Sequence, residues 1–66
     1  MWIVINGVRR EVSEAATLDG VVAAISTSAT GIAVAVNGEI VRRGHWPAVI
    51  LTAGDEVEVL TAVQGG

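Results

Sequence analysis

The chain of 66 residues contains no cysteine, no lysine, no phenylalanine and no tyrosine. Without cysteine it can form neither a disulfide nor a thiolate metal site. It is also near the lower size limit at which one hydrophobic core supports folding without such cross-links. We therefore predict one small domain over residues 1–66 that is stabilised by packing alone.

Basic residues are scarce, and long apolar runs are absent. The four basic side chains are all arginines, the net charge is −3, and aromatic residues are not interleaved with the arginine pairs. This composition argues against nucleic-acid binding and suits an electropositive protein partner better. No segment is long and apolar enough to span a bilayer, and the stretch after Met1 lacks the features of a signal peptide. We expect a soluble, cytoplasmic protein.

Small aliphatic residues dominate the composition, because 52% of the chain is hydrophobic and most of that is Val, Ala and Ile. Two strand-like stretches, Met1–Ile5 and Val8–Val12, flank the dipeptide Asn6-Gly7. Both residues of that dipeptide tolerate positive φ, which strongly favours a hairpin. The polar middle of the second stretch predicts a strand near a sheet edge.

One helix is predicted, from about Leu18 to Ser26. Thr17 can cap its N-terminus, and Asp19 lies in the first turn, where the helix dipole favours negative charge. Apolar residues recur at the spacing i, i+3, i+4, i+7, which predicts one buried stripe. This stripe consists of Leu18, Val21, Val22 and Ile25.

The second half of the chain predicts another hairpin and a last strand. Residues 32–41 surround a second Asn-Gly dipeptide, and the strand before it is apolar on both faces, as is typical of the interior of a sheet. A short helical turn is predicted at Pro47–Leu51, and the last strand from Glu56 to about Ala62. One helix across one face of a mixed sheet is an α+β fold. The order of the elements suggests a β-grasp, with the first and last strands adjacent and parallel.

Four stretches carry a more specific likeness: "INGVRREV", "VAVNGEIVRRGHW", "LTAGDEVEVL" and the terminal "AVQGG". With them the chain resembles the ThiS family, the ubiquitin-like sulfur carrier proteins of thiamin biosynthesis, over essentially its whole length. Where the family often has proline after "NGEIV", this chain has Arg42. The resemblance implies a ubiquitin-like β-grasp with a mixed sheet of four to five strands.

The resemblance also implies a chemistry at the carboxylate of Gly66. An E1-like adenylyltransferase, using ATP and Mg, would adenylate it. A persulfide donor, such as a cysteine desulfurase or a rhodanese-like protein, would convert it to a thiocarboxylate that donates sulfur to thiazole synthase. The carrier itself would have no catalytic residue, no metal and no bound cofactor. Residues 62–66 would form a flexible tail, and Val63, Gln64 and Gly65 would thread into the partner, because glycine lacks the Cβ that would obstruct a narrow channel.

Strand alternation predicts that the sheet has one face toward the helix and one face away from it. On the face away from the helix we expect one contiguous apolar patch that leads to the tail and serves as the docking surface for the adenylating enzyme, and also for thiazole synthase. The patch is predicted to consist of Trp2, Val4, Ala33, Ala35, Leu60 and Ala62.

The remaining candidate residues are interpreted as structural. His45 has no Cys, His or acidic cluster at ligand spacing, so no metal site is expected. Trp46 and Pro47 are expected to anchor the irregular segment, and Asp55 to shape the turn after Gly54.

Two other functions stay open on the residues alone. A related carrier would deliver sulfur to molybdopterin, tRNA or another thio-cofactor pathway. A β-grasp interaction module would have an inert tail, in which case Gly65 and Gly66 are only a frayed end. A small hydrolase or nuclease is excluded, because the sequence offers neither a nucleophile–base pair nor a carboxylate cluster.

Overall fold

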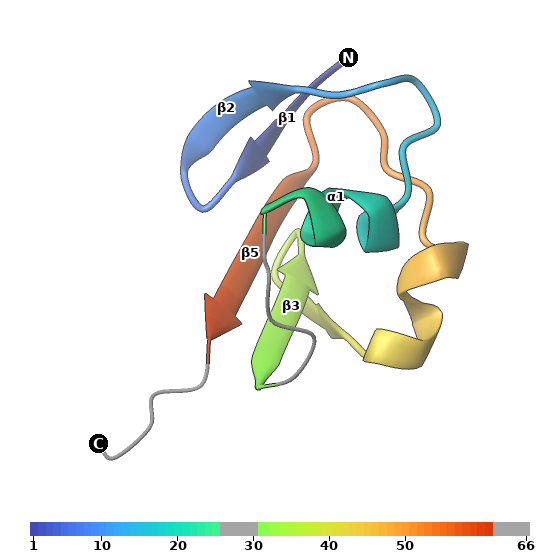
Figure 1. Cartoon of the computed structure of the whole chain (residues 1–66). Coiled ribbons are helices and arrows are strands. Elements are labelled where there is room, and N and C mark those ends of the chain that lie inside the picture. The colour runs from blue at the N-terminus through green and yellow to red at the C-terminus, as the bar shows by residue number, and fades with distance from the viewer. Residues whose placement is uncertain (26–30, 62–66) are drawn as a thin grey trace.

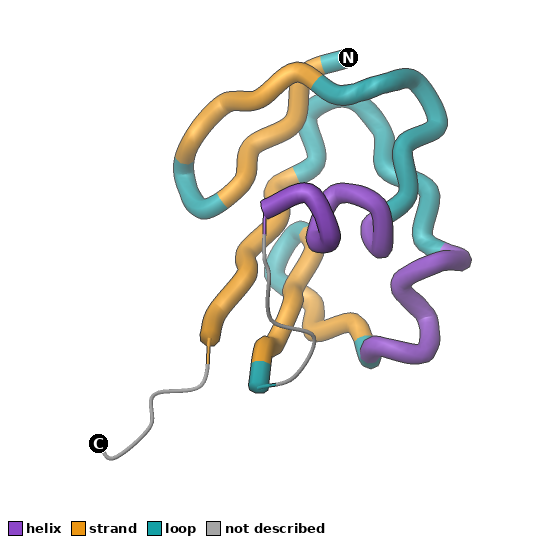
Figure 2. The backbone as a smooth tube through the Cα atoms, viewed as in Figure 1, coloured by secondary structure: helices purple, strands orange, loops and turns teal. Residues whose placement is uncertain are grey.

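The structure is a computed structural model that describes residues 1–25 and 31–61, with side chains to residue 60. A five-stranded sheet has helix α1 packed across one face (Figures 1 and 2). The strands are β1 Trp2–Ile5, β2 Val8–Glu11, β3 Ile32–Val36, β4 Glu39–Val41 and β5 Glu56–Thr61, and the helices are α1 Leu18–Ile25 and the 3₁₀ helix η1 Arg43–Ala48.

Strand β5 lies in the centre of the sheet, whose order is β2-β1-β5-β3-β4. It runs parallel to β1 and antiparallel to β3, and the outer strands β2 and β4 pair antiparallel with their neighbours. The predicted parallel pairing of the first and last strands is therefore confirmed, as are the edge position of β2 and the interior position of β3. The arrangement is that of a ubiquitin-like β-grasp.

Both hairpins turn at an Asn-Gly dipeptide with positive φ at each residue. The φ values are 50° and 79° at Asn6 and Gly7, and 51° and 85° at Asn37 and Gly38. Left-handed values at both central residues define the two-residue turn whose twist matches that of the flanking strands. The two predicted hairpins are thus confirmed.

Helix α1 begins as predicted and buries three of the four residues of the predicted stripe, whereas the fourth, Ile25, is half-buried. The backbone N–H of Gly20 donates to Thr17 Oγ1 at 3.2 Å, which satisfies one of the free donors at the helix start. Leu18, Val21 and Val22 are buried. The predicted end at Ser26 lies outside the described residues, within which no helix is long and apolar enough to cross a membrane.

The core lies between α1, the inner face of the sheet and the segment around η1. Its members share almost complete burial and come from every layer of the fold. They are Ile3, Ile5, Leu18, Val21, Val22, Val34, Trp46, Leu51 and Val57.

The predicted helical turn at Pro47–Leu51 is wrong in position, because η1 covers Arg43–Ala48. The cause is Trp46, whose side chain is only 4% exposed and whose indole N–H donates to the carbonyl of Val41 at 2.9 Å. To bring this indole under the sheet so soon after β4, the chain must coil upstream of Pro47. The predicted anchoring role of Trp46 is confirmed, whereas Pro47 is exposed.

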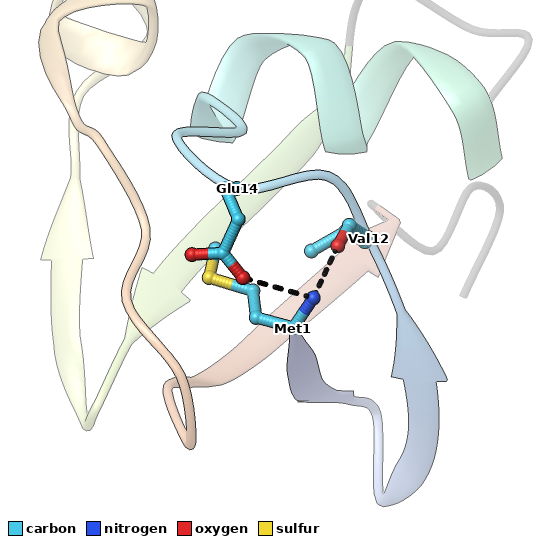
Figure 3. A network of polar contacts seen from close by, with 3 residues as sticks. All are labelled: Met1, Val12 and Glu14. Carbon is cyan, nitrogen blue, oxygen red and sulfur yellow. Dashed lines mark hydrogen bonds and ion pairs between the residues drawn. The ribbon is translucent and has the colours of Figure 1, made fainter.

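A network of polar contacts around the amino terminus joins the two strands of the first hairpin at the end away from its turn (Figure 3). The α-ammonium of Met1 donates to the carbonyl of Val12 at 2.7 Å, and the N–H of Val12 donates to the carbonyl of Met1 at 2.8 Å. The predicted strands included these two residues, which still pair although β1 begins one residue after Met1 and β2 ends one residue before Val12. The carboxylate of Glu14 lies 3.4 Å from the ammonium.

Candidate functional site

Strand β5 leads toward the predicted sulfur attachment point. It is paired with β1 on one side and with β3 on the other, as far as the pair of Ile32 with Thr61. The predicted tail, its threading residues and the attachment point lie outside the described residues. They are Ala62, Val63, Gln64, Gly65 and Gly66.

Asn6 extends the pairing of β5 beyond the end of β1. Its backbone N–H donates to the carbonyl of Val57 at 2.9 Å. Its side chain then bonds both backbone groups of Val59: Nδ2 donates to the carbonyl at 3.2 Å, and Oδ1 accepts from the N–H at 2.8 Å. The Asn6 side chain therefore makes the two hydrogen bonds that a further residue of β1 would have made with β5. It holds β5 at Val59, two residues before the strand ends at Thr61.

Asn37 does the same at the other end of β5. Its Oδ1 accepts from the N–H of Glu56 at 2.9 Å, and its backbone N–H donates to the carbonyl of Glu56 at 2.7 Å. Its Nδ2 donates to Asp55 Oδ1 at 3.0 Å. The two hairpin asparagines thus hold the two ends of the central strand, a role that sequence reasoning missed because it read them only as turn residues.

Replacing Asn6 with glycine is expected to loosen the end of β5 specifically. Glycine keeps the positive φ, so the change removes the two side-chain hydrogen bonds and should lower the free energy of unfolding by about 1–2 kcal/mol. Amide hydrogen exchange should become faster at Val59. Asn37→Gly is the matched control, since it should cost a similar free energy in urea unfolding but increase exchange at Glu56 instead. Equal exchange profiles for the two variants would contradict this role.

Asp55 shapes the turn before β5, as predicted. Its Oδ2 accepts from the backbone N–H of Thr52 at 2.8 Å, and its Oδ1 accepts from Asn37 Nδ2 and from Thr52 Oγ1. These bonds, chiefly the one from the Thr52 backbone and next that from Asn37, hold the pKa of the Asp55 carboxyl below its ordinary value of 3.8.

A lowered pKa in the folded state makes the stability depend on pH in one direction. The contribution of Asp55 is fully present above the unfolded-state pKa and is lost as the pH falls through the lower, folded-state pKa. Asp55→Asn keeps the size and shape of the side chain but removes its titratable carboxyl group. We expect urea unfolding below about pH 4 to show a shallower loss of stability for this variant than for wild type. If the free energy of unfolding falls equally steeply with decreasing pH for both proteins, Asp55 does not contribute to the acid sensitivity.

The outer face of the sheet, away from α1, carries the residues predicted for docking. Trp2 is 45% exposed and Leu60 61% exposed. Ala33 is also exposed, Val4 is half-buried and Ala35 is buried. The last member, Ala62, is among the residues that the structure does not describe.

The predicted contiguity of this patch is wrong. The register places Glu56 beside Val4 and Glu58 beside Ala35, so two carboxylates run down the middle of the outer face. Alternation along β5 places both glutamates on the same face as Leu60, but only the strand order shows that β5 lies between β1 and β3. The face therefore has two apolar areas separated by negative charge.

The apolar area nearer the end of β5 contains a residue that the sequence reasoning missed. Ile40 is 71% exposed and lies opposite Ala35 on the neighbouring strand, while Ala33 lies opposite Leu60. The signal was available, because a two-residue Asn-Gly turn fixes the register of β3 with β4. We call Ala33, Ile40 and Leu60 the tail-side area.

The other apolar area is partly covered by a cation. The guanidinium carbon of Arg9 lies 4.5 Å from the centroid of the Trp2 ring, and Arg9 is paired with Val4 across β1 and β2. This distance is within the range of a cation–π contact. The tail-side area is consequently the more open of the two apolar areas.

The remaining candidates do not gather into a site. His45 is exposed on η1. Among residues 1–25 and 31–60 no three or more His, Asp or Glu side chains come together in a way that could hold a metal ion.

The fold and the central strand that leads toward a Gly-Gly sequence define a ubiquitin-like β-grasp protein. The ThiS family model matches residues 3–66, and the chain belongs to the ThiS family, whose members are small carrier proteins and not enzymes. The crystal structure of the thiamine biosynthesis protein (ThiS) from Geobacter metallireducens is similar, with 29% identity, a TM-score of 0.86 and 100% of both chains covered. A solution structure of a thiamine biosynthesis protein from the same organism shares 28% identity and a TM-score of 0.78, covering 100% of this chain and 88% of that one. No curated protein sequence matches the chain.

Proposed function

We propose that this chain carries sulfur for thiamin biosynthesis as a thiocarboxylate on Gly66. Family membership and the two similar thiamine biosynthesis structures support the pathway. The absence of cysteine from the sequence supports the carboxylate as the attachment point, since no side chain can hold a persulfide or a thioester. The observation that carries the proposal is the central strand β5, bonded on both sides, which is followed in sequence by "AVQGG".

The chemistry is supplied by the partners. In an adenylyltransferase, a carboxylate oxygen of Gly66 attacks the α-phosphorus of Mg-bound ATP, and pyrophosphate leaves. The terminal sulfur of a persulfide donor, a cysteine desulfurase or a rhodanese-like protein, then attacks the acyl carbon, and AMP leaves. A thiol attacks the donor's sulfur atom in the resulting S–S bond and forms a disulfide with the donor, and the thiocarboxylate on Gly66 is the leaving group. This sulfur is a far better nucleophile than a carboxylate oxygen and attacks an electrophilic precursor on thiazole synthase.

The chain itself contributes reach and a docking surface. An extended segment from Ala62 to Gly66 spans at most about 17 Å, enough to place the carboxylate in a recessed site while the folded body stays outside. The glycines suit a narrow channel because they lack Cβ. The tail-side area, with Glu58 beside it, fits an apolar surface on the partner that is bordered by basic side chains. Trp2 and Val4 would extend this contact across the face.

Alkylation tests the attachment point cleanly. The protein is incubated with the adenylating enzyme, ATP and a sulfur donor, and is then treated with a thiol alkylator and digested. We expect label on the C-terminal peptide alone, and only when ATP is present. Because the chain has no cysteine, no side-chain thiol competes for the reagent. An unlabelled C-terminal peptide under these conditions would refute the proposal and favour an interaction module with an inert tail.

A further inference from the structure

A groove of about 630 Å³ lies between the first hairpin and α1. It opens toward α1 and reaches round the edge of the hairpin to Trp2 and Arg9. Part of its lining is small or apolar, and Gly20 and Ala24 on α1 leave room for a backbone to come close. In Figure 1 the β1–β2 hairpin extends beyond the end of the helix, which leaves this side of the hairpin uncovered. The groove lining includes Ile5, Arg10, Val12, Ala16, Val21 and Ile25.

The groove is bordered by β2, which among the described strands has a neighbour on one side only. Met1 and Val12 each donate a backbone hydrogen bond to the other. In an antiparallel pair of strands, residue pairs that are bonded in this way alternate with pairs that are not. The N–H and C=O groups of Arg10 and Val8 therefore also point toward β1. The N–H and C=O groups of Arg9 and Glu11 then point to the free edge. Their spacing of two residues is the spacing at which a further strand forms its hydrogen bonds.

Arg10 gives this edge a positive charge on the groove side. It is paired with Ile3, a core residue, so its side chain lies on the face of the hairpin that looks toward α1, whereas Arg9 lies over Trp2 on the other face. Within the described part of the chain, the structure pairs neither arginine with a carboxylate. An acidic side chain beside Arg10 would therefore form a new ion pair without displacing one.

A second copy of this chain is a poor occupant. In a two-fold antiparallel pairing of β2 with another β2, one residue must lie opposite its own copy. The registers that pair the outward backbone groups of β2 with one another place Arg9, Arg10 or Glu11 in that position, and each is charged. Like charges directly opposite each other destabilise a strand pair. Only the register centred on Arg10 partly offsets this repulsion, because it sets Arg9 opposite Glu11.

We propose that this groove binds an extended segment of another protein, which adds to β2 as a sixth strand of the sheet. Alternate apolar side chains of the segment would enter the groove against α1, and an acidic residue would face Arg10. This interaction does not involve Gly66 or the tail-side area, although the groove reaches Trp2. A carrier bound in this way would keep its proposed sulfur site and the tail-side area free.

A synthetic peptide tests the proposal. The probe is an end-blocked peptide of alternating valine and isoleucine with two aspartates at each end, titrated into the isotope-labelled full chain and followed by NMR. We expect chemical-shift changes along β2 and α1, and slower amide exchange at Arg9 and Glu11 but not at Arg10, whose amide is already bonded. Arg10→Glu should weaken binding about tenfold. The matched control is Arg42→Glu, the same charge change at an exposed arginine beyond β4, and it should bind like wild type.

Several results would overturn the proposal. These are no binding at millimolar peptide, equal affinities of the Arg10→Glu and Arg42→Glu variants, or shift changes that map to Leu60 and Ala33. Shifts along β2 that grow with protein concentration in the absence of peptide would assign the edge to a second copy instead. A peptide with lysines in place of the aspartates should bind more weakly than the probe, and tighter binding would contradict the role of Arg10.

Discussion

Deletion of Gly66 is expected to lower the yield of thiocarboxylate by more than about a hundredfold. The shortened chain still ends in a carboxylate, but that carboxylate stops about 3.5 Å short of the reacting position. Misplacement of reacting groups by even about 1 Å can cost a hundredfold in rate. The measurement is alkylation of the C-terminal peptide after incubation with the adenylating enzyme, ATP and the sulfur donor.

A change of side chain at unchanged length is the control for this deletion. Gln64→Ala keeps the reach of the chain, so we expect it to be loaded much more fully than the deletion variant. Both changes lie beyond Thr61 in the sequence, where β5 ends, so we expect both proteins to unfold at the urea concentration of wild type. If the deletion variant is labelled as fully as wild type, the carboxylate of Gly66 is not where the sulfur is carried.

Much of the fold could be predicted because its determinants are local. The Asn-Gly dipeptides set the two hairpins, and the spacing of apolar residues set α1 and its buried stripe. The register of each hairpin follows from the length of its turn. The pairing of β1 with β5 is not local, and it was predicted from the order of the elements and from the resemblance to known folds.

Three of the errors and omissions depend on side-chain contacts or strand neighbours that the pattern of apolar residues does not specify. The position of η1 depends on the indole of Trp46 reaching the carbonyl of Val41. The separation of the outer apolar residues by Glu56 and Glu58 depends on β5 lying between β1 and β3. The bonds from Asn6 to Val59 span 53 residues. Composition and periodicity contain no information on these contacts.

The charged middle of the outer face changes what a partner must offer. A wholly apolar surface would be recognised by its apolar area alone, whereas this face presents two carboxylates between its two apolar areas. Complementary basic residues on the partner would speed association and fix the orientation of the carrier, and this effect should weaken as salt is added. The apolar residues beside the carboxylates would then determine how slowly the complex dissociates.

Leu60→Glu is expected to weaken binding to the adenylating enzyme by about tenfold or more, which corresponds to about 1.4 kcal/mol or more. Leu60 is 61% exposed and opposite Ala33 in the tail-side area, so the substitution places a charge in the apolar contact and adds to the negative charge of Glu58. Because the side chain contributes little to the core, the free energy of unfolding should change by no more than about 0.5 kcal/mol.

The matched control for Leu60→Glu is Ile50→Glu. Ile50 is 63% exposed, so the same change of charge is made at the same degree of exposure, but Ile50 pairs with Thr17 at the start of α1 and lies off the outer face. Affinities measured by calorimetry should separate the two variants, with Ile50→Glu close to wild type. Equal affinities for both would show that the enzyme does not dock on the tail-side area, and a Leu60→Glu protein that unfolds would show that Leu60 belongs to the core.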